Sequence, residues 1–585
     1  RAPSAAASAR TAKRATRSLV LLTVGMLLLV TAAPFALNLA GDAQVHLAIA
    51  EAFAAGRPFQ YNPGGEIVVA STSPFWTLLL MLYFRLAGPL TPALLSLTVV
   101  LFWLATGYLL YRVARDVWGM RGVALWAVEL LWLGHTTIVA NALGGLENVA
   151  AALQLLLLYW LIAGGRQTTD HRRPPSATRY IAIGLVLGWA LLTRPDGGSF
   201  ALISLALALP LPLTTDHRPQ TTNRRPWSVV RGLFLIAAVA AAVLAPWFLY
   251  QYRLTGNLLT DSSLARLYNG RMGALPLIPG LLYLHPKALV SLATAFLPLG
   301  LGFLVTTGAL AARFVQTKGE RRALYRAEFP RLAAVLLVVA GVLFYTFVVG
   351  AEAFGRYFLP LFPFFFLSGV DGLRIVAARL AVVGGPRSAV VLLTLAVLFL
   401  AATSALDLYR RLGPGRFAPE RALDVIEGPA NLRYYAANVP WLLAAPGRRA
   451  ELTDGFLSDL GAPPTGDVSI AVTEVQLRYF LDQRVTVLSL DGRTSAGILT
   501  YVDPTSGVPD FERYFLAVRP DYVHAAQWCA VGGWLARVLP AAIADNLVCA
   551  WEQRAAAMAP GESFDWQGNT VTLVAPGILH IDWDT

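Results

Sequence analysis

Charged residues are scarce in this chain of 585 residues: Asp, Glu, Lys and Arg make up 14% of it, whereas hydrophobic residues make up 56%. A soluble protein carries about 25% charged residues, so this chain cannot cover itself with a water-compatible surface. Uncharged apolar runs recur along it, for example at 18–37, 332–349 and 389–405. Because about 20 apolar residues span the bilayer core as a helix, the composition predicts a polytopic α-helical membrane protein.

Cysteine is also rare. The two cysteines, Cys529 and Cys549, both lie in the more polar C-terminal part of the chain. In an extracytoplasmic domain they could form a disulfide, and two unrelated thiols are an equally open interpretation. The sequence contains no Cys-x-x-Cys pair and no cluster of Cys and His, so it gives no signal of a structural metal site.

The positive charge is gathered in clusters, and the formal net charge is +12. Clusters rich in Lys and Arg favour the cytoplasmic side of a membrane. All six clusters before the C-terminal part lie on that side if eleven helices span the membrane, so no nucleic-acid partner is needed to explain them. The clusters are 10–17, 112–121, 166–179, 218–231, 313–331 and 374–387. The expected spans are 18–37, 92–112, 121–141, 147–164, 179–194, 197–213, 230–250, 287–312, 332–350, 356–377 and 387–407.

The apolar stretch 74–88 is not counted among these spans. It is short, and counting it would move every later basic cluster to the wrong side. We expect it to lie in the membrane interface or to re-enter, with Arg85 extending its charged end towards water.

Three parts follow from this topology. Residues 1–17 form a cytoplasmic basic tail, and residues 18–407 form the transmembrane domain, whose external loop 38–91 carries interfacial helices. Residues 408–585 form an extracytoplasmic α/β domain, in which the alternating segments 468–472 and 485–490 predict strands. The expected location is a cell membrane, with the N-terminus in the cytoplasm.

Ionisable residues occur in the turns on the expected outer side. Such residues at a membrane boundary are costly and tend to be functional, although each alone is more often a helix cap, an anchor or half of a structural ion pair. Asp42 and His46 share one face if their segment is helical. Together the set predicts one outward-facing cavity, where a carboxylate acts as general base and arginines bind phosphate. The set is Asp42, His46, Glu147, Arg194, Asp196, Glu352 and Arg356.

Short motifs follow one another in a recognisable order. They are Gly41-Asp42-Ala43-Gln44, Asn62-Pro63-Gly64, Ser71-Thr72-Ser73-Pro74-Phe75-Trp76, Gly145-Leu146-Glu147, Leu192-Thr193-Arg194-Pro195-Asp196-Gly197, Pro246-Trp247-Phe248, Gly256-Asn257-Leu258-Leu259 and Gly355-Arg356-Tyr357-Phe358-Leu359-Pro360. This ordered set resembles the GT-C fold glycosyltransferases. The greatest resemblance is to the bacterial branch that includes the terminal arabinofuranosyltransferases; the protein O-mannosyltransferases are more distant.

The resemblance implies an inverting glycosyltransferase that moves a sugar from a polyprenyl-phosphate donor to an acceptor glycan, lipid or protein outside the membrane. Asp42 matches the family's catalytic base. The other candidates are substrate-binding residues: Arg194 and Arg356 for the lipid phosphate, Glu147 and Asp196 for sugar hydroxyls or for stabilising the arginines, Trp76 as a stacking face, and His46 beside the base.

The sequence departs from the family pattern at three places. Gly41 stands where the family commonly has the first Asp of a pair, Gln44 where it often has Tyr, and Thr260-Asp261 where Pro-Asn is usual. Since one of two possible metal-chelating carboxylates is missing, we expect no metal and no other cofactor. Gly41 also favours an alternative, a catalytically degenerate GT-C-like subunit of a membrane complex. A lipid or solute transporter is a further alternative, although the sequence lacks a detectable inverted repeat.

Overall fold

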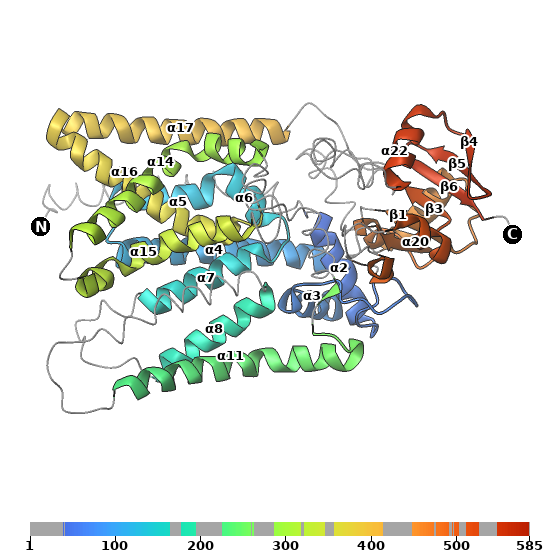
Figure 1. Ribbon diagram of the computed structural model, residues 1–585, viewed down its shortest axis with the longest axis horizontal. Helices are drawn as coiled ribbons and strands as arrows, with labels where there is room; N and C mark the ends of the chain where they lie inside the picture. The colour runs from blue at the N-terminus through green and yellow to red at the C-terminus, as the bar shows by residue number, and fades with distance from the viewer. Residues whose placement is uncertain are drawn as a thin grey trace, which may run out of the picture.

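The computed structural model describes residues 39, 41–163, 177–194, 225–258, 260–261, 286–317, 321–345, 356–412, 447–472, 475–490, 494, 496–501, 510–525 and 547–583. Within these residues, a bundle of long helices is followed by a smaller domain built on a β-sheet (Figure 1). The predicted fold class, a polytopic helical membrane protein with a C-terminal α/β domain, is confirmed at this level.

The bundle helices follow the expected spans in order. They are α4 (Thr91–Arg112), α5 (Val123–Gly134), α6 (Thr136–Leu143), α7 (Asn148–Ala163), α8 (Ala177–Thr193), α11 (Arg225–Thr255), α14 (Pro286–Gln316), α15 (Arg321–Phe344), α16 (Phe362–Gly384) and α17 (Pro386–Leu412). The helices α5 and α6 are bent by 51° and together occupy the expected 121–141 span.

The number of spans is only partly tested. Among the described residues, six helices are long and apolar enough to cross a membrane, or seven if the bent pair is one span; α7 and α8 are shorter apolar helices. The expected spans 18–37 and 197–213 lie outside the described residues. The total of eleven therefore stays a prediction.

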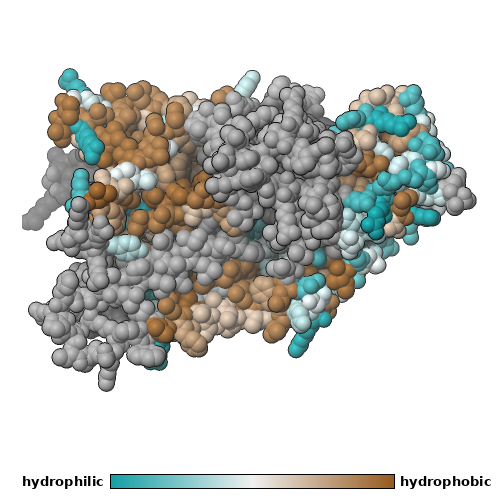
Figure 2. All heavy atoms as spheres, viewed as in Figure 1, coloured by the Kyte–Doolittle hydropathy of each residue, from teal (hydrophilic) through white to brown (hydrophobic). Residues whose placement is uncertain are grey.

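The bundle exposes an apolar surface. On α17, side chains such as Val390, Leu395 and Leu398 are largely exposed. Figure 2 shows hydrophobic residues over much of the bundle and hydrophilic residues over the sheet domain. A surface of this kind is stable only when lipid covers it, which agrees with a bundle set in a membrane.

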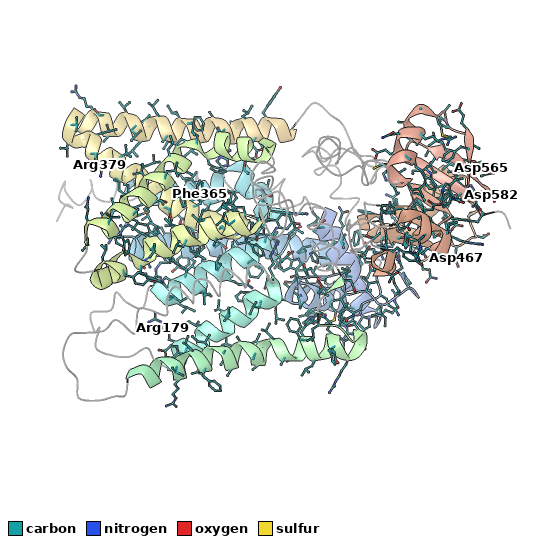
Figure 3. The ribbon with its side chains drawn as sticks, in the orientation of Figure 1. Arg179, Phe365, Arg379, Asp467, Asp565 and Asp582 are labelled. Atoms are coloured by element: carbon teal, nitrogen blue, oxygen red, sulfur yellow. The ribbon has the colours of Figure 1, made fainter. Side chains whose placement is uncertain are left out.

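Residues from two of the basic clusters lie at the same end of the bundle. Figure 3 places Arg179 and Arg379 at the end remote from the sheet domain, which itself carries Asp467, Asp565 and Asp582. The polarity that the charge clusters predict is therefore present in the fold, while the assignment of this end to the cytoplasm stays a prediction.

Close helix packing fixes the centre of the bundle. Gly302 of α14 lies against Gly369 and Gly372 of α16, so closely that a Cβ at any of the three would collide with the facing backbone. Small residues permit such an approach between membrane helices. Next to this crossing, Phe296 packs on Phe362 and the aromatic residues that follow it, which positions the start of α16.

Two short helices lie at the end of the bundle nearest the sheet domain: α2 (Gly41–Ala54) and α3 (Pro74–Ala87) (Figure 1). Helix α3 ends at Gly88, whose φ of 52° breaks the helix before the 3₁₀ turn η1 (Gly88–Leu90) and α4. Leu78, Leu82 and Leu86, one turn apart, are 40%, 47% and 74% exposed. The exposed apolar stripe is compatible with an interfacial helix. However, α3, η1 and α4 belong to one continuous helical run, Pro74–Val117, so the interfacial position of 74–88 stays a prediction.

The C-terminal domain has a six-stranded mixed sheet in the order β2-β1-β3-β6-β5-β4. Strand β1 pairs in parallel with β2 and β3, whereas β3, β6, β5 and β4 pair antiparallel. Both predicted strands are present, as β1 (Val468–Val472) and β2 (Val485–Ser489). The other strands are β3 (Tyr522–His524), β4 (Ser563–Trp566), β5 (Asn569–Ala575) and β6 (Ile578–Asp582). A helix over 447–459, α20 (Phe511–Val518) and α22 (Leu547–Ala557) complete the domain, and the 3₁₀ turns η6 (Val475–Tyr479) and η7 (Ala496–Tyr501) follow β1 and β2.

The segment 41–91, which the sequence analysis expects on the outer side, ties this domain to the bundle. The Asn62 amide donates to the Val487 carbonyl at 2.8 Å and accepts from the Val487 amide at 3.0 Å, so it pairs with β2 as another strand residue would. The Arg449 guanidinium bonds both carboxylate oxygens of Glu51 on α2, at 2.8 and 2.6 Å. Cys549 is buried and disulfide-bonded, and Cys529 lies outside the described residues.

Candidate active site

A small pocket lies at the end of the bundle that faces the sheet domain. It collects five of the seven predicted site residues from four separate segments: α2, the start of α7, the end of α8 and the turn before the 3₁₀ turn η5 (Leu359–Leu361). The lining residues are Asp42, His46, Thr72, Leu146, Glu147, Asn148, Arg194, Arg356 and Tyr357. Five residues that were predicted to meet in one cavity therefore do line one pocket, whereas the outward orientation of that pocket stays a prediction.

Helix α2 supplies Asp42 and His46 from one face, as their spacing predicts. Asp42 lies in the first turn of the helix, where a carboxylate is favoured by the unpaired amides and the helix dipole. Four residues on, the His46 Nε2 lies 3.3 Å from Oε2 of Glu147. The two side chains thus enter the pocket together.

Glu147 is the buried centre of the pocket. Its carboxylate receives His46 on one oxygen and Arg194 Nη1 on the other, at 3.4 Å. The Glu147 side chain is only 8% exposed, so its carboxylate depends on these two partners. Its geometry suits a residue that orients His46 and Arg194.

The turn before Glu147 depends on a glycine. Gly145 has a φ of 79°, and a Cβ there would meet Leu39 Cδ2 at 2.5 Å, so only glycine fits. The Gly145 carbonyl accepts a hydrogen bond from the Trp76 indole at 3.2 Å. Trp76 is 0% exposed, so it supports the turn from behind and does not offer a stacking face to the pocket in this state.

Arg194 is held on three sides. Besides Glu147, it donates to the Asn148 side-chain oxygen, and its guanidinium carbon lies 5.3 Å from the centre of the Tyr357 ring. Arg356 lies on the same ring at 5.1 Å. The single tyrosine therefore positions both arginines by cation–π contacts.

Arg356 forms an ion pair with the predicted base. Its Nη1 lies 2.7 Å from Oδ2 of Asp42, and each side chain is one-third exposed. The pair thus joins the predicted proton acceptor to a predicted phosphate-binding residue, and both side chains still reach solvent.

The pocket is narrow in this state. Its cavity measures about 30 Å³, which holds water but not a sugar ring. A sugar phosphate can enter only if side chains at its mouth move, and the exposed Asp42–Arg356 pair is the most accessible of the described contacts there.

One predicted residue among those described, Trp76, does not line the pocket and is buried behind it. Asp196 and Glu352 lie outside the described residues. Four lining residues were not among the predicted ones: Thr72, Leu146, Asn148 and Tyr357. Each adjoins or lies within a motif that the sequence analysis singled out, and that adjacency is the only signal by which they could have been found.

No group of three or more His, Cys, Asp or Glu residues is placed to hold a metal among the residues that the structure describes. The five pocket residues offer two carboxylates, but each is engaged by an arginine. That no metal is required stays a prediction.

Comparison with known proteins gives one sequence relative. No family model matches the chain. Over 209 residues it is 32% identical to the terminal β-(1→2)-arabinofuranosyltransferase of Mycobacterium tuberculosis; the match covers 34% of this chain and 31% of that protein. The chain therefore matches about a third of the relative's length, and its resemblance to this branch of glycosyltransferases is confirmed at that extent.

Solved structures were compared as well. Two crystal structures of ArnT from Cupriavidus metallidurans, one bound to undecaprenyl phosphate and one in the apo state, align with 89% of this chain and 95% of theirs. The sequence identity is 17% in both cases, and the TM-scores are 0.47 and 0.49.

Proposed function

We propose that this chain is a GT-C type glycosyltransferase, which moves a sugar from a polyprenyl-phosphate donor to an acceptor hydroxyl at the outer face of a membrane. The observation that carries the proposal is the pocket itself: a solvent-reaching carboxylate and two arginines meet at the end of the bundle remote from the basic clusters. The ordered sequence motifs and the arabinofuranosyltransferase relative support the same reaction class.

The reaction needs a base and a stabilised leaving group. In the proposed step, Asp42 takes the proton of the acceptor hydroxyl. The hydroxyl oxygen bonds to the anomeric carbon as the bond from that carbon to the phosphate oxygen breaks, and the configuration inverts. The electron pair leaves with the polyprenyl phosphate, whose added negative charge Arg356 and Arg194 neutralise.

The same arginine holds Asp42 before the donor binds. A donor phosphate that bonds to Arg356 competes with the Asp42 carboxylate for the same nitrogen atoms. Donor binding would then release the base next to the place where the acceptor hydroxyl must sit. Glu147 and His46 lie behind this pair and would hold sugar hydroxyls or keep Arg194 in place.

The test is a transfer assay with the purified full chain in nanodiscs. Polyprenyl-phosphate sugars, with arabinofuranose and mannose first, are incubated with a panel of glycan, lipid and peptide acceptors, and products are identified by mass spectrometry. We expect transfer from at least one donor. Silence across the panel, from protein that binds the donor lipid and is folded, would contradict the proposal and favour the degenerate subunit that Gly41 suggests.

A further inference from the structure

A second pocket opens at the opposite, basic end of the bundle. It has a cavity of about 430 Å³ between α14, α15, α16 and α17, and it shares no residue with the candidate active site. We propose that it binds the phosphate headgroup of an anionic membrane phospholipid. The proposal does not depend on the glycosyltransferase reaction, because the two pockets lie at different ends of the helices.

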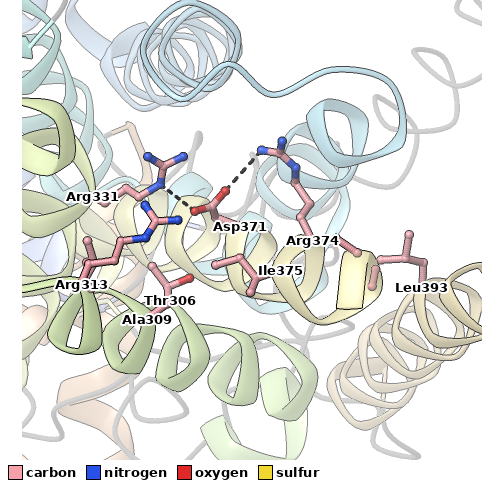
Figure 4. Close-up of a pocket in the computed structure, with 11 residues that line it drawn as sticks. Thr306, Ala309, Arg313, Arg331, Asp371, Arg374, Ile375 and Leu393 are labelled. Carbon is pink, nitrogen blue, oxygen red and sulfur yellow. Dashed lines mark hydrogen bonds and ion pairs between the residues drawn. The ribbon is translucent and has the colours of Figure 1, made fainter. Parts of the chain in front are cut away.

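Three guanidiniums lie around the pocket, one from each of three helices: Arg313 on α14, Arg331 on α15 and Arg374 on α16 (Figure 4). Two carboxylates oppose them, Glu328 and Asp371. Three positive charges minus two negative charges leave one positive charge, so the cluster favours an additional anion.

The three arginines are engaged to different degrees. Arg331 is bound to both carboxylates, to Glu328 at 3.0 Å and to Asp371 at 2.8 Å. It therefore holds α15 against α16. The other two arginines are each paired through Nη1 with one carboxylate, within the described residues.

Donor groups for an anion remain at the pocket. The side chains of Arg313 and Arg374 are 51% and 40% exposed. A guanidinium has five N–H donors, and one nitrogen of each is used in these pairs. The two side chains can thus bond phosphate oxygens from opposite sides without breaking the network that Arg331 maintains.

The remaining walls of the pocket are apolar, which favours a lipid over a free anion. They include Leu310 of α14, Ile375 of α16 and Leu393 of α17. Residues beside Leu393 on α17, such as Val390 and Val391, are exposed on the outer face of the bundle. A headgroup at the arginines therefore leaves its acyl chains against apolar helix surface, whereas inorganic phosphate gains nothing from these walls. Basic pockets between membrane helices are known to recognise anionic headgroups in this way.

The test measures lipid binding to the full chain. Delipidated protein is titrated with phosphatidylglycerol, with phosphatidylcholine and with inorganic phosphate, and bound lipid is counted by native mass spectrometry. The pocket variant combines Arg313→Gln with Arg374→Gln. The matched control combines Arg379→Gln with Arg387→Gln, which removes the same charge from exposed positions of α16 and α17 outside the pocket.

We expect the parent and the control to prefer phosphatidylglycerol, and the pocket variant to bind it about tenfold more weakly, since it loses charge-assisted hydrogen bonds. Equal losses in both double variants would overturn the proposal, because they would indicate general attraction to a basic surface. Inorganic phosphate binding as tightly as the lipid would also overturn it.

If the pocket variant fails to fold, Ala309→Phe fills the cavity while all three arginines remain. Undiminished phosphatidylglycerol binding by that variant would contradict the site.

Discussion

The Asp42 carboxylate lies 2.7 Å from the Arg356 guanidinium, although 314 residues separate them in the sequence. The ion pair joins helix α2 to the turn before α16, at the mouth of a pocket too small for a sugar. In the proposed reaction, this ion pair marks the closed state of the pocket. Asp42 and Arg356 stay bonded to each other until the phosphate of the donor takes the place of the Asp42 carboxylate.

Arg356→Gln is expected to weaken use of the lipid donor. It removes charge-assisted bonds to the phosphate, which are worth roughly 1.5–3 kcal/mol each, so kcat/KM for the donor should fall about ten- to a hundredfold. Arg356→Lys should retain part of the activity, because it keeps the charge but not the planar fork. Steady-state kinetics with varied donor measures both, with Arg379→Gln as the control at the other end of the bundle. Unchanged donor kinetics in Arg356→Gln would contradict the assignment.

Glu147→Gln is expected to lower the stability of the fold as well as the rate of sugar transfer. Removing one partner of a buried ion pair leaves Arg194 without its counter-charge, which typically costs about 3–5 kcal/mol. The apparent melting temperature of the purified protein should therefore fall. Asp565→Asn, at an exposed position on β4, is the matched control and should melt with the parent. Identical melting of Glu147→Gln and the parent would show that the ion pair is not formed.

Asn62→Ala should loosen the contact between the external loop and the sheet domain. The amide of Asn62 satisfies both backbone groups of Val487 at the edge of β2, and unsatisfied buried groups cost about 1–3 kcal/mol. Hydrogen exchange at residues 485–489 should accelerate in the variant. Exchange at residues 569–575 in β5, farther along the sheet, serves as the internal control. Unaltered exchange at β2 would mean that the loop is held by other contacts.

Much of this architecture follows from simple sequence patterns. Apolar runs interrupted by basic clusters place the turns at Asp42, Glu147 and Arg194 at one end of the bundle, because consecutive spans alternate in direction. The spacing of Asp42 and His46 predicts a shared helix face. These regularities are local or alternate along the chain, so one sequence is enough to read them.

Other features depend on tertiary packing that no local pattern encodes. Trp76 is in a motif that suggests substrate stacking, yet its indole is buried and bonds to the Gly145 carbonyl. Tyr357 lies between two arginines from distant segments, and Asn62 pairs with a strand 425 residues away. Nothing near these residues in the sequence distinguishes a buried partner from an exposed one.

If Asp42 is the base of sugar transfer, its loss must slow the chemical step, which a single-turnover measurement isolates. Protein pre-loaded with radiolabelled polyprenyl-phosphate sugar is mixed with acceptor, and the rate of product formation is compared among the parent, Asp42→Asn and the control Asp565→Asn. We expect Asp42→Asn to retain bound donor but to transfer it more slowly by about a hundredfold or more, while the control matches the parent. Equal rates in all three proteins would contradict the role of Asp42.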